Sequence, residues 1–168
     1  MMLILWLSAC TVTAMVIHEM GHLYAARACG VTATELGIGL GPKLFGLRIG
    51  GVSFSLRALP LGSFVRLNGL ELRSRHIAQQ IFIHLAGVAV NLAAAAVFFG
   101  THLGWINLLL ALANLLPIYQ HDGWKCCVVL MRALVGRPSR PVEWVFTFSG
   151  GVATFVILQA ALRWYHLI

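Results

Sequence analysis

The sequence predicts a membrane protein built as an all-α bundle of about four transmembrane helices, with a short membrane-associated β-hairpin or sheet between the first two helices. Two observations predict this class. Of the 168 residues, 60% are hydrophobic and 10% are charged, whereas a soluble domain carries roughly 25% charged residues. The charged residues also gather in a few stretches, which long uncharged segments separate. We therefore interpret residues 1–168 as a single membrane-embedded domain.

The placement of the basic residues argues against a nucleic-acid partner, although the net charge is +7 at pH 7. Seven of the twelve Lys and Arg residues lie between Arg27 and Arg75, and four lie between Lys125 and Arg140. Two basic segments separated by uncharged ones follow the positive-inside bias of membrane proteins. We therefore expect a lipid bilayer as partner, no nucleic acid, and both basic segments on the cytoplasmic side.

Uncharged stretches of sufficient length define the expected spans. We place transmembrane helices over residues 3–29, 77–99, 105–116 and 144–162. The third span is short and ends at Pro117, which is typical of irregular backbone beside a site. A turn is expected over residues 100–104, and a basic loop over residues 125–140.

Residues 32–68 differ from the spans because they are rich in glycine and contain alternating polar and apolar residues. Gly50 and Gly51 stand between two such runs, as in a hairpin with a two-residue turn. We therefore expect a short β-sheet in this segment, on the cytoplasmic side.

A His-Glu-x-x-His motif interrupts the first span at His18, Glu19 and His22. Histidines four residues apart lie on one face of a helix, about 5.4 Å from each other along its axis. Both imidazoles can therefore bind one zinc ion, and the intervening glutamate can act on a water molecule there. The alternative is a helical ion pair with capped histidines, which an apolar span disfavours because buried ionisable groups are costly.

A hydrolytic zinc site needs a third protein ligand and one open position. Asp122 is the best candidate, because His18 and Asp122 are both expected in the inner half of the membrane. Two alternatives stay open. Asp122 could cap a helix that starts at Gly123, and His121 could bind the metal itself or hydrogen-bond to a ligand.

Several motifs resemble, in order and spacing, the site-2 protease family of intramembrane metalloproteases, and the resemblance covers most of the chain. They are His18-Glu19-Met20-Gly21-His22, Gly39-Leu40-Gly41-Pro42, Leu59-Pro60-Leu61-Gly62-Ser63-Phe64-Val65, Ala86-Gly87-Val88-Ala89-Val90-Asn91 and the run from Asn114 to Gly123. The resemblance implies one Zn²⁺ per chain, held by His18, His22 and Asp122, with Glu19 as the general base. One departure is Gly62-Ser63-Phe64-Val65, where the family has Gly-Gly-Tyr-Val.

The resemblance also implies the activity: a zinc metalloendopeptidase of regulated intramembrane proteolysis, which hydrolyses a peptide bond in or near the transmembrane segment of a membrane-protein substrate. It further implies a minimal, bacterial-type member without a PDZ module, multi-pass in the plasma (inner) membrane, with the active site towards the cytoplasm and a regulatory membrane partner. Asn91 and Asn114 could donate hydrogen bonds to substrate or oxyanion, or make contacts between helices.

Two other classes compete with the protease hypothesis. One is a non-catalytic scaffold of the same family that holds client helices, which the presence of Glu19 disfavours. The other is a di-iron membrane oxidase, which needs histidines in several boxes, whereas this chain has one such pair.

Overall fold

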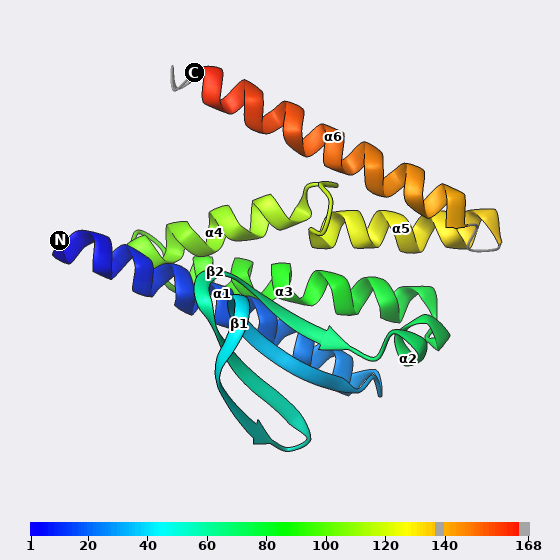
Figure 1. Ribbon diagram of the computed structural model, residues 1–168, viewed down its shortest axis with the longest axis horizontal. Helices are drawn as coiled ribbons and strands as arrows, with labels where there is room; N and C mark the ends of the chain where they lie inside the picture. Colours follow the sequence, from blue (N-terminus) through cyan, green and yellow to red (C-terminus); the bar gives the residue numbers. More distant parts are fainter. Residues whose placement is uncertain (137–139, 165–168) are drawn as a thin grey trace.

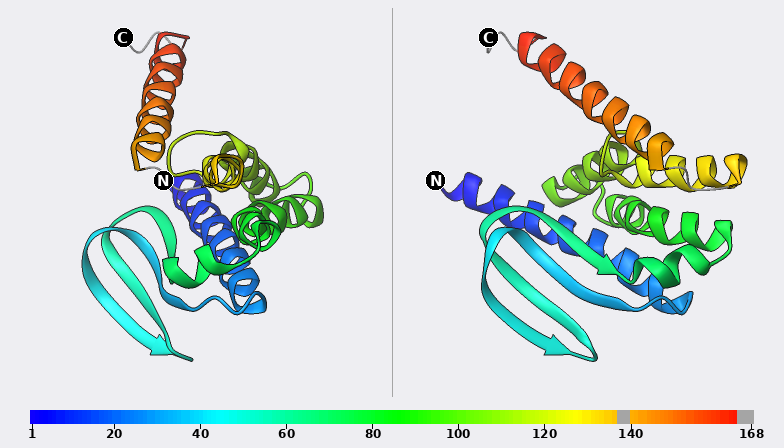
Figure 2. Two further views of the ribbon diagram at one scale, coloured as in Figure 1. Left: turned by 90° about the vertical axis from the view of Figure 1, so that its right-hand side faces the viewer. Right: turned by 45° about the vertical axis from the view of Figure 1, so that its right-hand side comes forward.

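The computed structural model describes residues 1–136 and 140–164. A group of helices packs side by side, and a long twisted hairpin lies against them (Figures 1 and 2). In chain order the elements are α1 (Met2–Ala28), β1 (Ala33–Ile49), β2 (Val52–Leu67), α2 (Gly69–Ser74), α3 (Ile77–Val97), α4 (His102–Leu115), α5 (Asp122–Val135) and α6 (Arg140–Trp164). The predicted helical class and a hairpin between the first two long helices are confirmed, but the strands, with 17 and 16 residues, are longer than the short hairpin that was expected.

Among the described residues, α1 and α3 are long and apolar enough to cross a bilayer. Helix α4 and residues 147–157 of α6 form shorter apolar helices. Four spans therefore stay a prediction, although a helix occurs at each predicted position.

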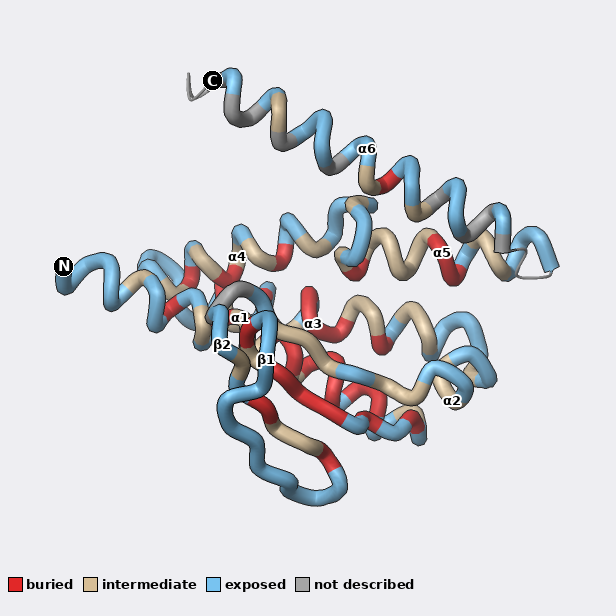
Figure 3. Tube along the Cα trace, in the orientation of Figure 1, coloured by how far each residue is buried: buried red, intermediate tan, exposed pale blue. Residues whose placement is uncertain are grey.

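Helices α1 and α3 pack closely through the half of α1 that carries the motif. The buried residues of α1 concentrate in this half, whereas the first residues of the helix are exposed (Figure 3). A Cβ on Gly21 would lie 2.7 Å from the Ala86 carbonyl oxygen, so only glycine permits this crossing. Ile83 of α3, which is 0% exposed, packs in one cluster with Ala25 and Ala26 of α1. The motif is thus held against α3 by close packing.

The hairpin folds back on itself to make a wider sheet. β1 and β2 pair as antiparallel strands, and the turn between them is Gly50-Gly51, with φ of 57° and 85°, as the sequence predicts. Residues 35–38 pair with residues 63–66 and also with residues 53–56. In the described chain, residues 63–67 pair with β1 alone, so this segment forms an edge of the sheet.

Helix α4 begins earlier than predicted. Thr101 caps it by accepting a hydrogen bond on Oγ1 from the Gly104 backbone N–H at 3.1 Å, so Gly104 lies inside the helix rather than in the turn. The helix ends before Pro117, and Leu116 takes the extended ψ of 141° that a following proline favours.

The basic loop predicted over residues 125–140 is wrong, because most of this stretch belongs to α5. Val128 and Val129 are buried on the inner side of α5, while Lys125 and Arg132 stay partly exposed. The stretch is an amphipathic helix whose basic residues lie on the partly exposed side, and these residues led to the prediction of a loop. Gly136 ends it with a φ of 71°, a left-handed conformation that glycine adopts readily.

Candidate metal centre

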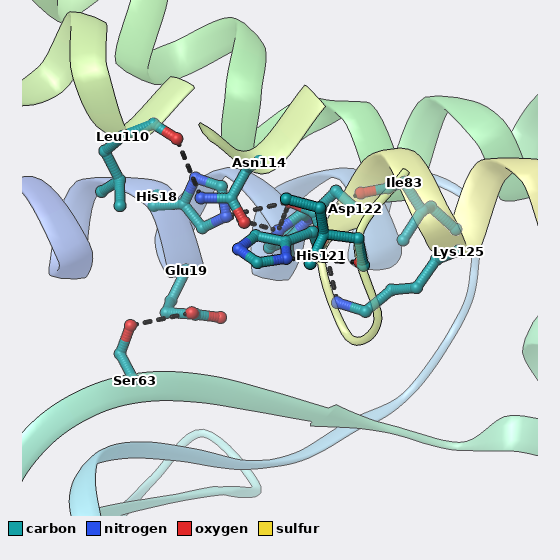
Figure 4. Close-up of polar contacts among 11 residues, drawn as sticks. His18, Glu19, Ser63, Ile83, Leu110, Asn114, His121, Asp122 and Lys125 are labelled. Carbon is teal, nitrogen blue, oxygen red and sulfur yellow. Dashed lines mark hydrogen bonds and ion pairs between the residues drawn. The ribbon is translucent and has the colours of Figure 1, made fainter. Parts of the chain in front are cut away.

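Three side chains from α1 and α5 converge on one point. The Nε2 atoms of His18 and His22 lie 3.1 Å apart. Asp122 Oδ2 lies 2.9 Å from His18 Nε2 and 3.0 Å from His22 Nε2. Figure 4 shows the Asp122 side chain reaching towards His18 from the start of α5. All three residues are buried, and Asp122 is 1% exposed.

The geometry and the donor types fit a divalent metal. Ligand atoms on a tetrahedral zinc ion, bound at about 2.0–2.1 Å, lie about 3.3 Å apart, close to the separations of the three atoms here. In the described part of the chain, His18, His22 and Asp122 are the one such group whose donor atoms all lie within 4.8 Å of one another. His121 does not belong to it.

The tautomer of His22 suits a metal ligand. Its Nδ1 lies 2.8 Å from the Ile83 carbonyl oxygen, and because a carbonyl only accepts, Nδ1 must donate. Nε2 of the neutral ring is then unprotonated and carries its lone pair towards His18 and Asp122. His18 Nδ1 is buried and finds no partner in the described residues.

Gly87 of α3 lies directly against both imidazoles. A Cβ at this position would lie 2.5 Å from His22 Nε2 and 2.8 Å from His18 Nε2. Any side chain there would enter the space that the ligand atoms share. The sequence placed Gly87 within a motif but gave it no role; a glycine four residues before a buried asparagine in an apolar helix was the available signal.

A tight turn after α4 delivers Asp122. Gln120, next to His121, has a φ of 72°, which is rare for a residue with a side chain. A Cβ on Gly123 would overlap the Leu115 carbonyl oxygen, so α5 starts against the end of α4. The helix begins at Asp122 with His121 as N-cap and no side-chain capping bond. The capping alternative for Asp122 is therefore wrong.

Lys125 holds the outer oxygen of Asp122, a contact the sequence analysis missed. Its Nζ lies 2.9 Å from Asp122 Oδ1, one helical turn further along α5. The two carboxylate oxygens are thus divided: Oδ1 faces the ammonium group and Oδ2 faces the imidazoles. A lysine three residues after a candidate ligand was the signal for this pairing.

Glu19 lies beside the three converging side chains and faces the hairpin. It is 7% exposed, and its Oε1 accepts a hydrogen bond of 2.8 Å from Ser63 Oγ of β2 (Figure 4). A cavity of 780 Å³ joins the parts of this site. Its lining includes the residues of the motif, Asp122, Asn114 and His121, together with residues 62–67 of β2.

The two asparagines of the sequence analysis occupy different places. Asn114 lines the cavity, and its Nδ2 donates to the Leu110 carbonyl oxygen at 2.9 Å. Asn91 is fully buried in α3, is not among the residues that line the cavity, and has no hydrogen-bond partner in the described residues. A substrate role for either residue stays a prediction, and the geometry favours Asn114.

A charged network fixes the sheet beside the cavity. Glu35 Oε1 accepts from Ser55 Oγ at 2.6 Å and from Arg57 Nη2 at 3.1 Å, and Arg66 Nη1 lies 3.3 Å from Glu35 Oε2. The hydrogen bond from Ser55, followed by the two arginines, lowers the pKa of Glu35 below 4.5.

Two histidines on one helical turn, the glutamate between them and a distant third ligand define a zinc-peptidase type of site. Residues 6–103 match the model of Peptidase family M50. This match covers more than half of the chain, and the chain belongs to that family.

Several relatives that match this chain carry zinc metalloprotease names. A candidate zinc metalloprotease of Clostridium perfringens is 36% identical over 91 residues, which cover 49% of this chain and 27% of that protein. A counterpart from Clostridium acetobutylicum is 38% identical with the same coverage. The zinc metalloprotease RasP of Shouchella clausii is 44% identical over 55 residues, 33% of this chain and 13% of RasP. The chain thus spans about a quarter or less of these relatives.

Proposed function

We propose that this chain is the catalytic core of a zinc metalloprotease that cuts a peptide bond in or near the transmembrane segment of a membrane-protein substrate. The observation that carries the proposal is the convergence of two imidazole nitrogens and one carboxylate oxygen within 3.1 Å of one another. Glu19 lines the same cavity. Membership of a peptidase family and the names of the relatives support it.

His18, His22 and Asp122 would hold the zinc ion. When bound, a zinc ion would lower the pKa of a water molecule, so that the water becomes a nucleophile near neutral pH, and would polarise a carbonyl group. Glu19 takes a proton from the attacking water as the water oxygen bonds to the scissile carbonyl carbon. Glu19 then gives this proton to the amine nitrogen as the carbon–nitrogen bond breaks. Asn114, on the cavity wall, would donate a hydrogen bond to the substrate backbone.

A substrate helix must unwind before its amides can be attacked, because intrahelical hydrogen bonds shield them. The edge formed by residues 63–67 of β2 borders the cavity. An unwound substrate segment can pair with such an edge through main-chain hydrogen bonds. This arrangement supports a substrate held as an extended strand between β2 and the metal ligands.

The length and apolar character of α1 and α3 support a place in the membrane. The proposal puts the chain in a bacterial plasma (inner) membrane as a multi-pass protein, with the cavity towards the cytoplasm because the basic residues flank that side. A membrane partner would regulate access to it.

Replacing Glu19 tests the proposal. Glu19→Gln keeps the shape of the side chain and removes the base, so we expect one bound zinc per chain and loss of cleavage. The assay uses the full chain in lipid vesicles with a fluorophore–quencher peptide of about 20 apolar residues and basic flanks. Zinc-loaded and chelator-treated wild-type chains are the controls. Equal cleavage by wild type and Glu19→Gln would remove this mechanism, and a wild type with bound zinc and no cleavage would favour the scaffold alternative.

A further inference from the structure

We infer that Ser63 is a positioning residue for Glu19, holding one oxygen of the catalytic carboxylate so that the other faces the reacting water. The inference rests on the proposed function and adds a residue to it. In the sequence, Ser63 stands where the family pattern has glycine.

The contact joins two parts of the fold that are distant in sequence. Ser63 Oγ lies 2.8 Å from Glu19 Oε1, and the residues are 44 positions apart. An ionised carboxylate only accepts hydrogen bonds, so the serine hydroxyl donates. A hydrogen bond to a charged acceptor is among the stronger ones in proteins. Figure 4 shows Ser63 rising from β2 towards Glu19, with the other labelled side chains on the far side of Glu19.

Phe64, the next residue after Ser63 on β2, is held by packing contacts, and these contacts fix the position of the Ser63 hydroxyl. The Phe64 ring lies against Gly37 of β1, where any Cβ would overlap it. The guanidinium carbons of Arg57 and Arg66 lie 5.0 Å and 5.8 Å from the ring centroid, within the range of cation–π attraction. The strand that carries Ser63 is therefore held by contacts that do not involve Glu19.

The bond has a direct consequence for proton transfer. A free glutamate side chain loses rotamer freedom when it is ordered, and the hydrogen bond from Ser63 supplies part of that ordering before substrate arrives. In the described residues no hydrogen bond joins Oε2 to the protein, so Oε2 is the oxygen left to take the proton. A glycine or alanine at position 63 would leave both oxygens free to rotate.

The test compares variants of one position in the vesicle assay with the same fluorophore–quencher peptide. Ser63→Ala removes the donor, and we expect kcat to fall roughly tenfold, since misplaced acid–base groups lose such factors. We expect KM to stay within about twofold of wild type, because the substrate pairs with main-chain groups of the strand edge and the substitution does not remove them. Ser63→Thr keeps the hydroxyl and restores kcat to within about threefold of wild type.

A matched control is Ser53→Ala, on another part of β2. Ser53 accepts a hydrogen bond from Lys43 Nζ at 3.3 Å and is half-buried, and we expect it to change neither constant. Bound zinc and thermal unfolding are measured on each variant, and both stay unchanged for Ser63→Ala.

Three results would overturn the inference while leaving the protease proposal intact. The first is a Ser63→Ala chain with wild-type or higher kcat. The second is an equal fall in kcat in Ser63→Ala and Ser63→Thr. The third is a fall in activity that comes from a raised KM or from a lower zinc content. Failure of the proposed function itself has a different signature, because wild type and Glu19→Gln would then be indistinguishable.

Discussion

The cavity has two walls that differ in how firmly the fold holds them. The helical wall includes His18, His22 and Asp122, all buried, with donor atoms about 3 Å apart, and Gly87 packs against both rings from α3. The strand wall consists of residues 62–67 of β2, partly exposed, with an unpaired edge. The first wall brings three metal-binding atoms into one fixed geometry, and the second presents the strand edge that the proposed function assigns to an extended substrate. Their hydrogen-bonded link is Ser63 to Glu19.

Filling the space at Gly87 should damage the helical wall most. Gly87→Ala puts a methyl group 2.5 Å from His22 Nε2, so the imidazoles must move. We expect this overpacking to cost about 2–3 kcal/mol, which corresponds to a loss in zinc affinity of about 100-fold. Competition with a chromophoric chelator measures the zinc affinity. Gly151→Ala, in a helix with open space around the glycine, is the control and should bind zinc normally. A wild-type zinc affinity in Gly87→Ala would show that the imidazoles can move aside without losing the metal-binding geometry.

Removing the ammonium group of Lys125 should have a smaller effect on the same wall. Lys125→Met leaves Asp122 Oδ1 buried without its partner at 2.9 Å, so the carboxylate can turn away from the imidazoles. We expect zinc affinity to fall by about tenfold, at the lower end for residues that orient ligands. Lys125→Arg restores part of the loss, and Lys43→Met, on the exposed side of the hairpin, changes nothing. An unchanged affinity in Lys125→Met would mean that α5 alone orients the carboxylate.

The smallest effect is expected at the strand wall, through Glu35. Because the folded pKa of Glu35 is lowered below 4.5, its ionised form stabilises the sheet above that pH, and this stabilisation is lost as the pH falls through the lowered value. Glu35→Gln should lower the free energy of unfolding of the sheet by about 1 kcal/mol at neutral pH. It should also make the stability of the sheet less dependent on pH in the acidic range. Hydrogen exchange of the backbone amides of residues 33–38, corrected for intrinsic exchange rates, measures the stability of the sheet and its pH dependence. Identical pH slopes in the two chains would contradict the role of Glu35.

The helical wall was largely readable from the sequence, and the strand wall was not. The spacing of His18 and His22 fixes their common face, because helical geometry is the same in every context. Asp122 could be found because its expected depth in the membrane matches that of His18. Ser63 and Lys125 escaped prediction, since their roles depend on where a hairpin and a helix pack. The helix α5 was missed because its basic residues were interpreted as a loop.

The ion-binding trio is completed late in the chain. Asp122 follows His22 by 100 residues, and α3 and α4 lie between them in sequence. A nascent chain that has left the ribosome only as far as α4 carries the two imidazoles without their carboxylate. Under the proposed function, such a chain lacks the full set of metal ligands, so the emerging polypeptide would gain peptidase activity only after α5 has reached its place beside α1.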